Sequence, residues 1–271
     1  MKTAIVTDTN SGITAQMARE MGIYLIPMPF FIDGSTYYEG ETCTPDFFFR
    51  HLKAKAEVST SQPSPEVITS LWASLLETHD AVLHFPMTAG LSGSCETAKA
   101  LAQEFDGRVL VVDDHRISVT LAQSIRNAQT LLAQGKTAQE VRGILEAEKD
   151  ASSIYIAVNT LEYLKKSGRV TAAGAAMAAV LHIKPVLQIQ GGKLDAYKKV
   201  RGMFQAKKDP RRRPPPRPGH PLCGHENGRL LRLLRRGPRP GEGLAAGGPG
   251  GLPRPAGGAD LPAPEHLLPH R

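Results

Sequence analysis

An abrupt change of composition near residue 208 confines the foldable part of this chain to its first three-quarters. Residues 208–271 hold 14 Pro and 12 Gly among 64 positions, and they contain no Val, Ile, Phe, Tyr, Trp, Met, Ser or Thr. A segment without β-branched or aromatic side chains cannot complete a sheet or fill a core, so we expect residues 208–271 to be disordered. We interpret them as the product of a reading-frame change in GC-rich coding DNA.

The net charge of the chain lies in the same segment. Residues 208–271 carry 12 Lys and Arg against 5 Asp and Glu, which accounts for the whole formal charge of +7. Residues 1–207 carry 21 residues of each sign and are neutral. Nucleic-acid binding through phosphates requires a basic surface, so we expect no specific nucleic-acid partner for residues 1–207.

The cysteines and the first residues of the chain indicate in which cellular compartment the protein resides. Cys43, Cys95 and Cys223 are widely spaced and form no CxxC pair, which favours a reducing compartment over a disulfide framework or a zinc site. Residues 3–7 already read as a strand rather than a signal peptide, and no apolar run approaches the ~20 residues that span a bilayer. We predict a cytoplasmic protein without a transmembrane segment.

Short apolar runs alternate with helical patterns through residues 1–207, which predicts an α/β fold with a mostly parallel sheet and flanking helices. Thr44 and Ser64 each precede a proline and mark helix starts, and Thr137 with Glu140 fits a capping box. A possible division near residue 150 gives a first lobe at 1–150 and the start of a second at 151–207. The predicted strands are 3–7, 23–28, 80–85, 108–113, 153–158 and 184–190, and the predicted helices are 14–21, 45–55, 64–77, 94–105, 117–134, 137–149, 160–166 and 171–182.

Three loops between a strand and a helix carry small hydroxyl or glycine residues, at 7–12, 59–63 and 89–94. Ligands of open α/β sheets bind at the carboxyl ends of the strands, where a helix N-terminus offers free N–H groups to an anion. Thr60, Ser92 and the N–H groups of Gly93 and Ser94 are therefore candidates for holding one carboxylate or phosphate. The alternative is that these hydroxyls only cap helices.

A second alternative makes Ser92 the nucleophile of a hydrolase or transferase, with His115 as base and Asp8 as its partner. The sequence around Ser92 is not the G-x-S-x-G elbow, however. His84 lies inside an apolar strand, as core histidines do. Since there is no paired-His spacing, Walker loop or G-x-G-x-x-G, we expect no metal and no cofactor.

Several short motifs occur in a specific order and spacing. They are IVTDTNSG at 5–12, TSQPS at 60–64, LSGS at 91–94, NTLEYLKKSGR at 159–169, HIKPVL at 182–187 and KKVR at 198–201. Together they resemble the DegV family of bacterial fatty-acid-binding proteins along essentially the whole of residues 1–207.

The resemblance implies two α/β lobes that bury a long-chain fatty acid, with its carboxylate held by Thr60, Ser92 and the Gly93 N–H group. It implies a lipid-binding subunit rather than an enzyme, with the fatty acid as its only small-molecule ligand. A separate ATP-dependent fatty acid kinase would make the acyl phosphate that enters phospholipid synthesis. Arg201 is implied as the contact for that kinase, and Arg169 is a second candidate.

The family's final segment has no counterpart after Lys207. That segment supplies strands of the second lobe and a His-Thr-Gly-Pro-Gly-like loop near the ligand head group. We therefore expect the second lobe to be incomplete and fatty-acid binding by this chain to be impaired.

Overall fold

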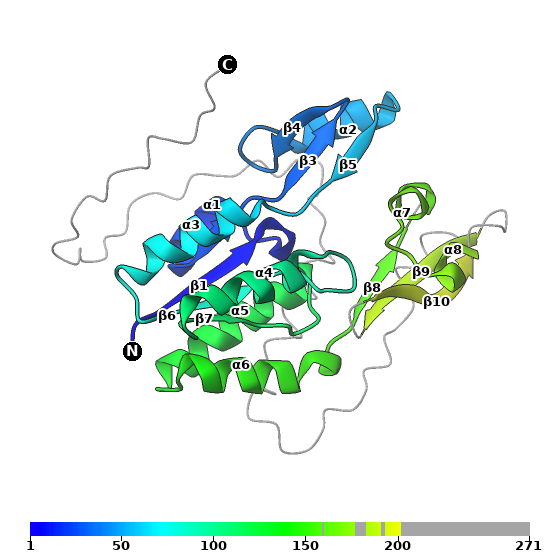
Figure 1. Cartoon of the computed structure of the whole chain (residues 1–271). Coiled ribbons are helices and arrows are strands. Elements are labelled where there is room, and N and C mark those ends of the chain that lie inside the picture. The colour runs from blue at the N-terminus through cyan, green and yellow to red at the C-terminus, as the bar shows by residue number, and fades with distance from the viewer. Residues whose placement is uncertain (159, 177–182, 191–192, 202–271) are drawn as a thin grey trace, which may run out of the picture. The chain divides into compact units, whose positions relative to one another are not determined.

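Four parallel strands form the central sheet of the structure, a computed structural model that describes residues 1–158, 160–176, 183–190 and 193–201 (Figure 1). The strands are β1 (Thr3–Asp8), β2 (Tyr24–Ile26), β6 (Ala81–Phe85) and β7 (Val109–Val111). Their order is β2-β1-β6-β7. Because β1 and β6 are central and parallel, with Thr7 opposite Phe85, the loops that follow them leave the sheet side by side.

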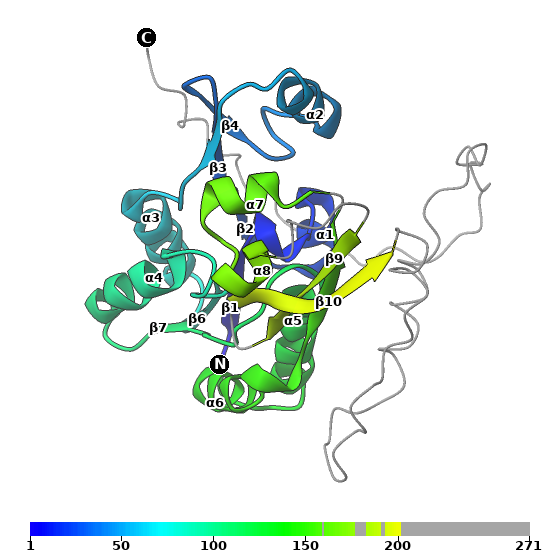
Figure 2. The same ribbon diagram turned by 90° about the vertical axis from the view of Figure 1, so that its right-hand side faces the viewer.

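Helices cover both faces of this sheet. They are α1 (Ala15–Met21), α3 (Pro65–Leu76), α4 (Ser94–Ala102), α5 (Ser118–Ala133) and α6 (Ala138–Ala147). Successive side chains of a strand point to opposite faces, so Ile5 packs with α1, α5 and α6, whereas Ala4 and Val6 pack with α3 and α4. Figure 2 shows α3 and α4 on one side of the strands and α5 on the other. The central strands are thereby buried on both faces, as the short apolar runs of β1 and β6 predict.

The helix starts predicted from capping residues are confirmed. Ser64 Oγ accepts from Val67 N at 3.3 Å at the start of α3. At the start of α6, Thr137 Oγ1 accepts from Glu140 N at 3.2 Å while the Glu140 carboxylate accepts from Thr137 N at 2.9 Å. Thr44 caps its helix in the same way. The predicted bounds of these helices differ from the observed ones by a few residues at the C-terminal ends.

A small antiparallel sheet, which was not predicted, follows β2. It contains β3 (Pro29–Ile32), β4 (Ser35–Tyr38) and β5 (Val58–Thr60) in the order β4-β3-β5. The helix α2 (Pro45–Lys53) packs on it through aromatic rings, with Phe48 edge-on to Phe30 at a centroid distance of 5.6 Å. No residue of α2 is buried. The strand β5 ends at Thr60, one of the candidate residues named in the sequence analysis.

A second antiparallel sheet lies after residue 150. Its strands are β8 (Ile154–Ala157), β9 (Ile183–Gln190) and β10 (Lys193–Arg201), in the order β10-β9-β8, and two short helices accompany them, α7 (Glu162–Ser167) and α8 (Ala172–Ala176). Of the helix predicted at 171–182, residues 177–182 lie outside the described residues. Leu161, Leu187 and Leu194 belong to the core of this second sheet and its helices, and Leu91 packs against that core.

The predicted fold class is confirmed in that the first lobe holds a parallel sheet with flanking helices. The division near residue 150 and the incompleteness of the second lobe stay predictions. Within the part of the chain that the structure describes, no helix is both long and apolar enough to cross a membrane.

Candidate functional site

The buried side chain of Asp8 ties together the loops that follow the two central strands. Its Oδ1 accepts from Asn10 N and its Oδ2 accepts from Met87 N, each at 2.8 Å. Burial raises the pKa of this carboxyl, while the two N–H groups act against the rise. Both carboxylate oxygens are thus engaged in fixing the backbone at the carboxyl ends of β1 and β6.

The loop between β6 and α4 places Ser92 at the start of α4. Leu91 N and Ser92 N donate to Thr88 O at 3.1 and 3.3 Å, which curls the loop toward the helix. Ser92 Oγ accepts from Ser94 N at 3.2 Å, so this hydroxyl does cap the first turn of α4, as the capping alternative expects. Among the contacts of the described residues, none uses the Ser92 hydroxyl hydrogen. That hydrogen, and the N–H groups of the first turn of α4 other than that of Ser94, are available to an anion.

The loop that follows Thr60 lies against the same helix start. Gln62 and Thr97 exchange a side-chain hydrogen bond, with Nε2 to Oγ1 at 3.1 Å and Oγ1 to Oε1 at 3.2 Å. A Cβ atom added at Gly93 would lie 3.4 Å from Gln62 Oε1, which is an ordinary contact and shows that Gly93 lies beside the Gln62 side chain. The predicted carboxylate-binding residues Thr60, Ser92 and Gly93 are therefore carried on adjacent loops, although no contact joins Thr60 directly to Ser92 among the described residues.

Arg169 also reaches this site. It is exposed, its Nε donates to Leu91 O at 3.4 Å, and its Nη1 donates to Ser167 O at 2.8 Å. A guanidinium therefore stands beside the loop that carries Ser92. Arg201 is the last residue of β10 and is paired with Ile183.

The structure groups His115 with acidic residues other than Asp8. His115 Nε2 lies 3.9 Å from Asp113 Oδ1, and Nδ1 lies 3.5 Å from Asp150 Oδ1. In the described part of the chain, no contact links His115 to Ser92 or Asp8. The hydrolase alternative accordingly gains no support from the geometry, because its base would have to lie within hydrogen-bond reach of its nucleophile.

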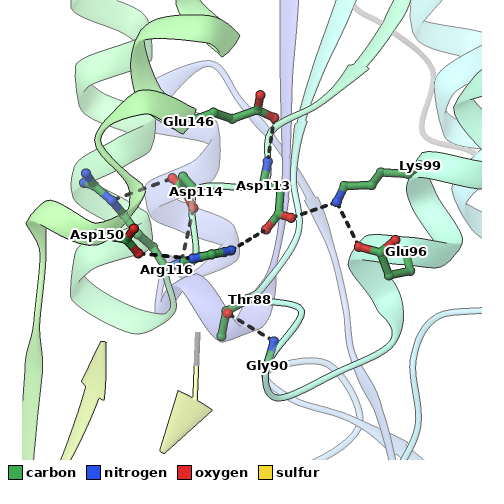
Figure 3. Close-up of polar contacts among 10 residues, drawn as sticks. Thr88, Gly90, Glu96, Lys99, Asp113, Asp114, Arg116, Glu146 and Asp150 are labelled. Carbon is green, nitrogen blue, oxygen red and sulfur yellow. Dashed lines mark hydrogen bonds and ion pairs between the residues drawn. The ribbon is translucent and has the colours of Figure 1, made fainter. Parts of the chain in front are cut away.

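A group of possible metal ligands was not foreseen. Cys95, Glu96 and Asp113 offer ligand atoms within 4.8 Å of one another. The Lys99 ammonium already lies there, 2.8 Å from Glu96 Oε1 and 2.7 Å from Asp113 Oδ2 (Figure 3). Burial raises the pKa of the Cys95 thiol to about 12, which keeps it protonated, whereas a metal ligand is a thiolate. Glu96 and Asp113 therefore suit the Lys99 ammonium better than they suit a metal ion.

Sequence reasoning missed two features of the site, the Gln62 bridge between the loops and the contact of Arg169 with Leu91. Both residues lie inside motifs that the sequence analysis singled out. Their partners, Thr97 and Leu91, are 35 and 78 residues away, and only the folded chain brings them together.

The chain was compared with known proteins. A family model described as "Uncharacterised protein, DegV family" matches residues 2–209. A DegV domain-containing protein of Deinococcus radiodurans is 34% identical over 210 residues, which cover 77% of this chain and 75% of the relative. One from Streptomyces coelicolor is 30% identical over 204 residues, covering 75% of this chain and 73% of the relative.

Solved structures resemble the chain over a similar share. A DegV family protein from Thermus thermophilus, described by its fatty-acid binding, matches with a TM-score of 0.71 and 32% identity, covering 76% of this chain and 74% of that one. A fatty-acid-binding DegV family protein from Streptococcus agalactiae matches with a TM-score of 0.69 and 30% identity, covering 76% and 75%. The family match ends at residue 209, where the composition changes.

Proposed function

The chain belongs to the DegV family, and on that basis we propose that it binds a long-chain fatty acid and presents the carboxylate to a separate ATP-dependent fatty acid kinase. The observation that carries this proposal is the Gln62–Thr97 contact, which sets the loop after Thr60 against the start of α4. An anion between these loops would meet two hydroxyl groups and the positive end of a helix. The fatty acids named in the descriptions of similar structures supply the class of anion.

In this proposal Ser92 donates its hydroxyl hydrogen to one carboxylate oxygen, and Thr60 and the Gly93 N–H group complete the site. These contacts orient the head group more than they hold the lipid. Burying a chain of about 16 carbons contributes on the order of 10 kcal/mol at ~0.8 kcal/mol per CH₂, before ordering costs. Hydrogen bonds to a charged group contribute only about 1.5–3 kcal/mol each.

We assign the phosphoryl chemistry, and the acyl phosphate for phospholipid synthesis, to the kinase. Arg201 is proposed as its contact, whereas Arg169 is proposed to act on the head-group loop as well, because its side chain holds Leu91 O. Arg201→Ala should therefore reduce acyl-phosphate formation in the presence of a DegV-associated kinase and leave lipid affinity unchanged. Arg169→Ala should reduce both. Equal effects of the two substitutions on lipid affinity would remove this distinction.

The chain's own C-terminal segment is proposed to impair lipid retention, because the family match ends at residue 209. The second sheet then ends, within the described residues, at β10. An acyl chain needs an enclosed apolar cavity to stay bound. The proposal divides the chain into a first lobe at 1–150, the start of a second at 151–207 and a tail at 208–271.

The test is extraction and mass spectrometry of lipid that co-purifies with this chain and with a version whose reading frame is restored after residue 207. We expect stoichiometric fatty acid in the restored protein and substoichiometric fatty acid in the present one. Absence of fatty acid from both would refute the binding function. Equal, full occupancy in both would refute the impairment alone.

A further inference from the structure

The helix α2 presents an aromatic and basic surface that the carboxylate site does not use. Its sequence, PDFFFRHLK, places three phenylalanines in a row, yet none of its residues is buried. Phe47 and Phe48 contact rings of the small sheet, at centroid distances of 5.4 Å from Tyr37 and 5.6 Å from Phe30. Phe49 has 54% of its surface exposed.

Basic residues follow Phe49 on α2 and just after it. Arg50 and Lys53 are exposed on α2, and the exposed Lys55 follows the helix. Lys53 is four residues after Phe49 and therefore lies on the same face of the helix. Within the described residues, no ion pair involves Arg50, Lys53 or Lys55. The one acidic residue of α2, Asp46, is at its opposite end.

A purely structural reading explains only part of this surface. Cations near a helix C-terminus offset the helix dipole, which accounts for Lys53. That effect gives no reason for a phenylalanine left more than half exposed beside them. Aromatic rings flanked by lysine and arginine on an amphipathic helix are typical of segments that lie in the interface of an anionic bilayer, with the rings among the acyl chains and the cations at the phosphates.

We propose that α2 is a docking surface for anionic lipid bilayers, with Phe49 inserted and Arg50 and Lys53 at the headgroups. The proposal rests on the proposed function, since a bilayer is where a long-chain fatty acid resides. The small sheet connects the two sites: Phe30 contacts Phe48 of α2 on one side and pairs with Thr60 of β5 on the other. Docking through α2 would bring the bilayer to the sheet that carries Thr60.

The test measures the full chain on extruded vesicles of phosphatidylcholine with and without phosphatidylglycerol, by co-sedimentation. Phe49→Ser is matched with Val67→Ser, which removes an apolar side chain 42% exposed on α3. Lys53→Ser is matched with Arg19→Ser, which removes an exposed cation on α1. The 12 Lys and Arg of residues 208–271 are present in every variant, so their attraction to the vesicles cancels in each comparison. Thermal melts check that every variant is folded.

We expect Phe49→Ser to lower the vesicle partition coefficient about fivefold, because one aromatic side chain no longer enters the interface. Lys53→Ser should lower it about fivefold on anionic vesicles only. The two control variants should bind as the unchanged chain does. Vesicle binding that is insensitive to both α2 substitutions, or equally sensitive to the controls, overturns the proposal.

Binding of a fluorescent fatty acid in vesicle-free solution is measured on the same proteins, so that the two proposals fail separately. Fatty-acid binding together with α2-independent vesicle binding leaves the proposed function standing and overturns the docking surface. Conversely, α2-dependent vesicle binding by a frame-restored protein that takes up no fatty acid supports the docking surface and overturns the proposed function.

Discussion

The Ser92 hydroxyl caps α4 through its oxygen, which accepts from Ser94 N, and keeps its hydrogen for another partner. A hydroxyl both donates and accepts, so capping and anion binding do not compete for the same lone pair. Capping even helps the proposed function, because it holds the oxygen in one orientation before the ligand arrives. A residue of this kind contributes to orientation more than to affinity.

Ser92→Ala should therefore weaken acyl-phosphate formation more than it weakens lipid retention, since one orienting hydrogen bond of the carboxylate is lost while the buried acyl chain, which contributes most of the binding free energy, is untouched. Coupled kinase turnover and mass spectrometry of retained lipid measure the two quantities. The frame-restored protein gives the clearest background. A parallel loss of both quantities contradicts the orienting role.

His84 is a buried residue of β6 whose titration should make the fold sensitive to acid. Burial lowers the pKa of His84 to about 3, from 6.5 when the residue is exposed. The unfolded chain therefore binds a proton below pH 6.5 that the folded chain refuses until pH 3, and stability falls across that window by about 1.4 kcal/mol per pH unit. Asp114 has the opposite effect on stability. Burial raises its pKa to about 6, so between about pH 6 and 4 the folded chain binds a proton that the unfolded chain does not, and stability rises as the pH falls.

His84→Leu removes the pH dependence of stability that comes from His84 and leaves the one that comes from Asp114. The free energy of unfolding of the variant minus that of the unchanged chain should rise by about 2 kcal/mol between pH 6.5 and pH 5. Urea unfolding at both pH values measures it, and pH 8 provides the reference. A difference that does not vary with pH would show that the folded protein accepts a proton on His84.

At the scale of elements, α6 depends on its first turn. The Thr137 and Glu140 side chains each accept from the other's backbone N–H, and Lys136 adds an ion pair to Glu140 at 3.0 Å. The Thr137 N–H and Lys136 together lower the pKa of Glu140 to about 2. The helix covers the same face of the sheet as α5, so its start influences the main core.

Thr137→Ala should cost about 1 kcal/mol of stability, since an N–H group at the helix start loses its acceptor. Urea unfolding at neutral pH measures the change. Thr130→Ala is the matched control: the Thr130 hydroxyl donates to Arg126 O inside α5, where no orphan N–H depends on it. An equal cost for both variants would mean that the capping box contributes nothing of its own.

The central sheet and its helices were predictable because their signals are local. β1 and β6 each hold a short apolar run, at residues 4–6 and 81–83, and Ser64 and Thr137 mark the starts of their helices in the sequence. β3, β4 and β5 were missed because they are three or four residues long and mostly half-exposed. β10 was missed because its sequence, KLDAYKKVR, is rich in charged residues and is typical of a loop. Its strand conformation depends on antiparallel pairing with β9, which the sequence of the segment alone does not indicate.

At the site, the residue types and loops were predictable, but their neighbours were not. Small hydroxyl residues after a strand indicate where an anion binds. Which loop meets which depends on contacts between residues far apart in the chain, such as Gln62 with Thr97. The same limit applies to His115, whose acidic neighbours include Asp150 rather than the predicted Asp8.

At the scale of the whole molecule, charge and family membership divide the chain at the same point. The DegV match covers residues 2–209, and the formal charge of +7 lies wholly in residues 208–271. Affinity for polyanions is therefore expected to belong to the segment outside the family match.

Ending the chain after Asp209 should abolish retention on heparin at low salt, whereas the full chain should be retained and elute as salt rises. Residues 1–209 remain neutral in formal charge, so they lack the required excess of cations. The salt concentration at which each protein elutes from the same heparin column measures the difference. Retention of the shortened chain would place a basic surface within residues 1–209.

The edge of the central sheet bears on how the protein behaves at high concentration. Arg108 O and Val112 N bond to β6, so the alternate residues Val109, Val111 and Asp113 turn their backbone groups outward. Glu146 accepts from Asp113 N at 3.1 Å, so that, within the described residues, only Val109 and Val111 keep outward backbone groups that could pair with a strand of a neighbouring molecule. We expect loss of Glu146 to lengthen this open edge, and therefore to raise light scattering at high protein concentration.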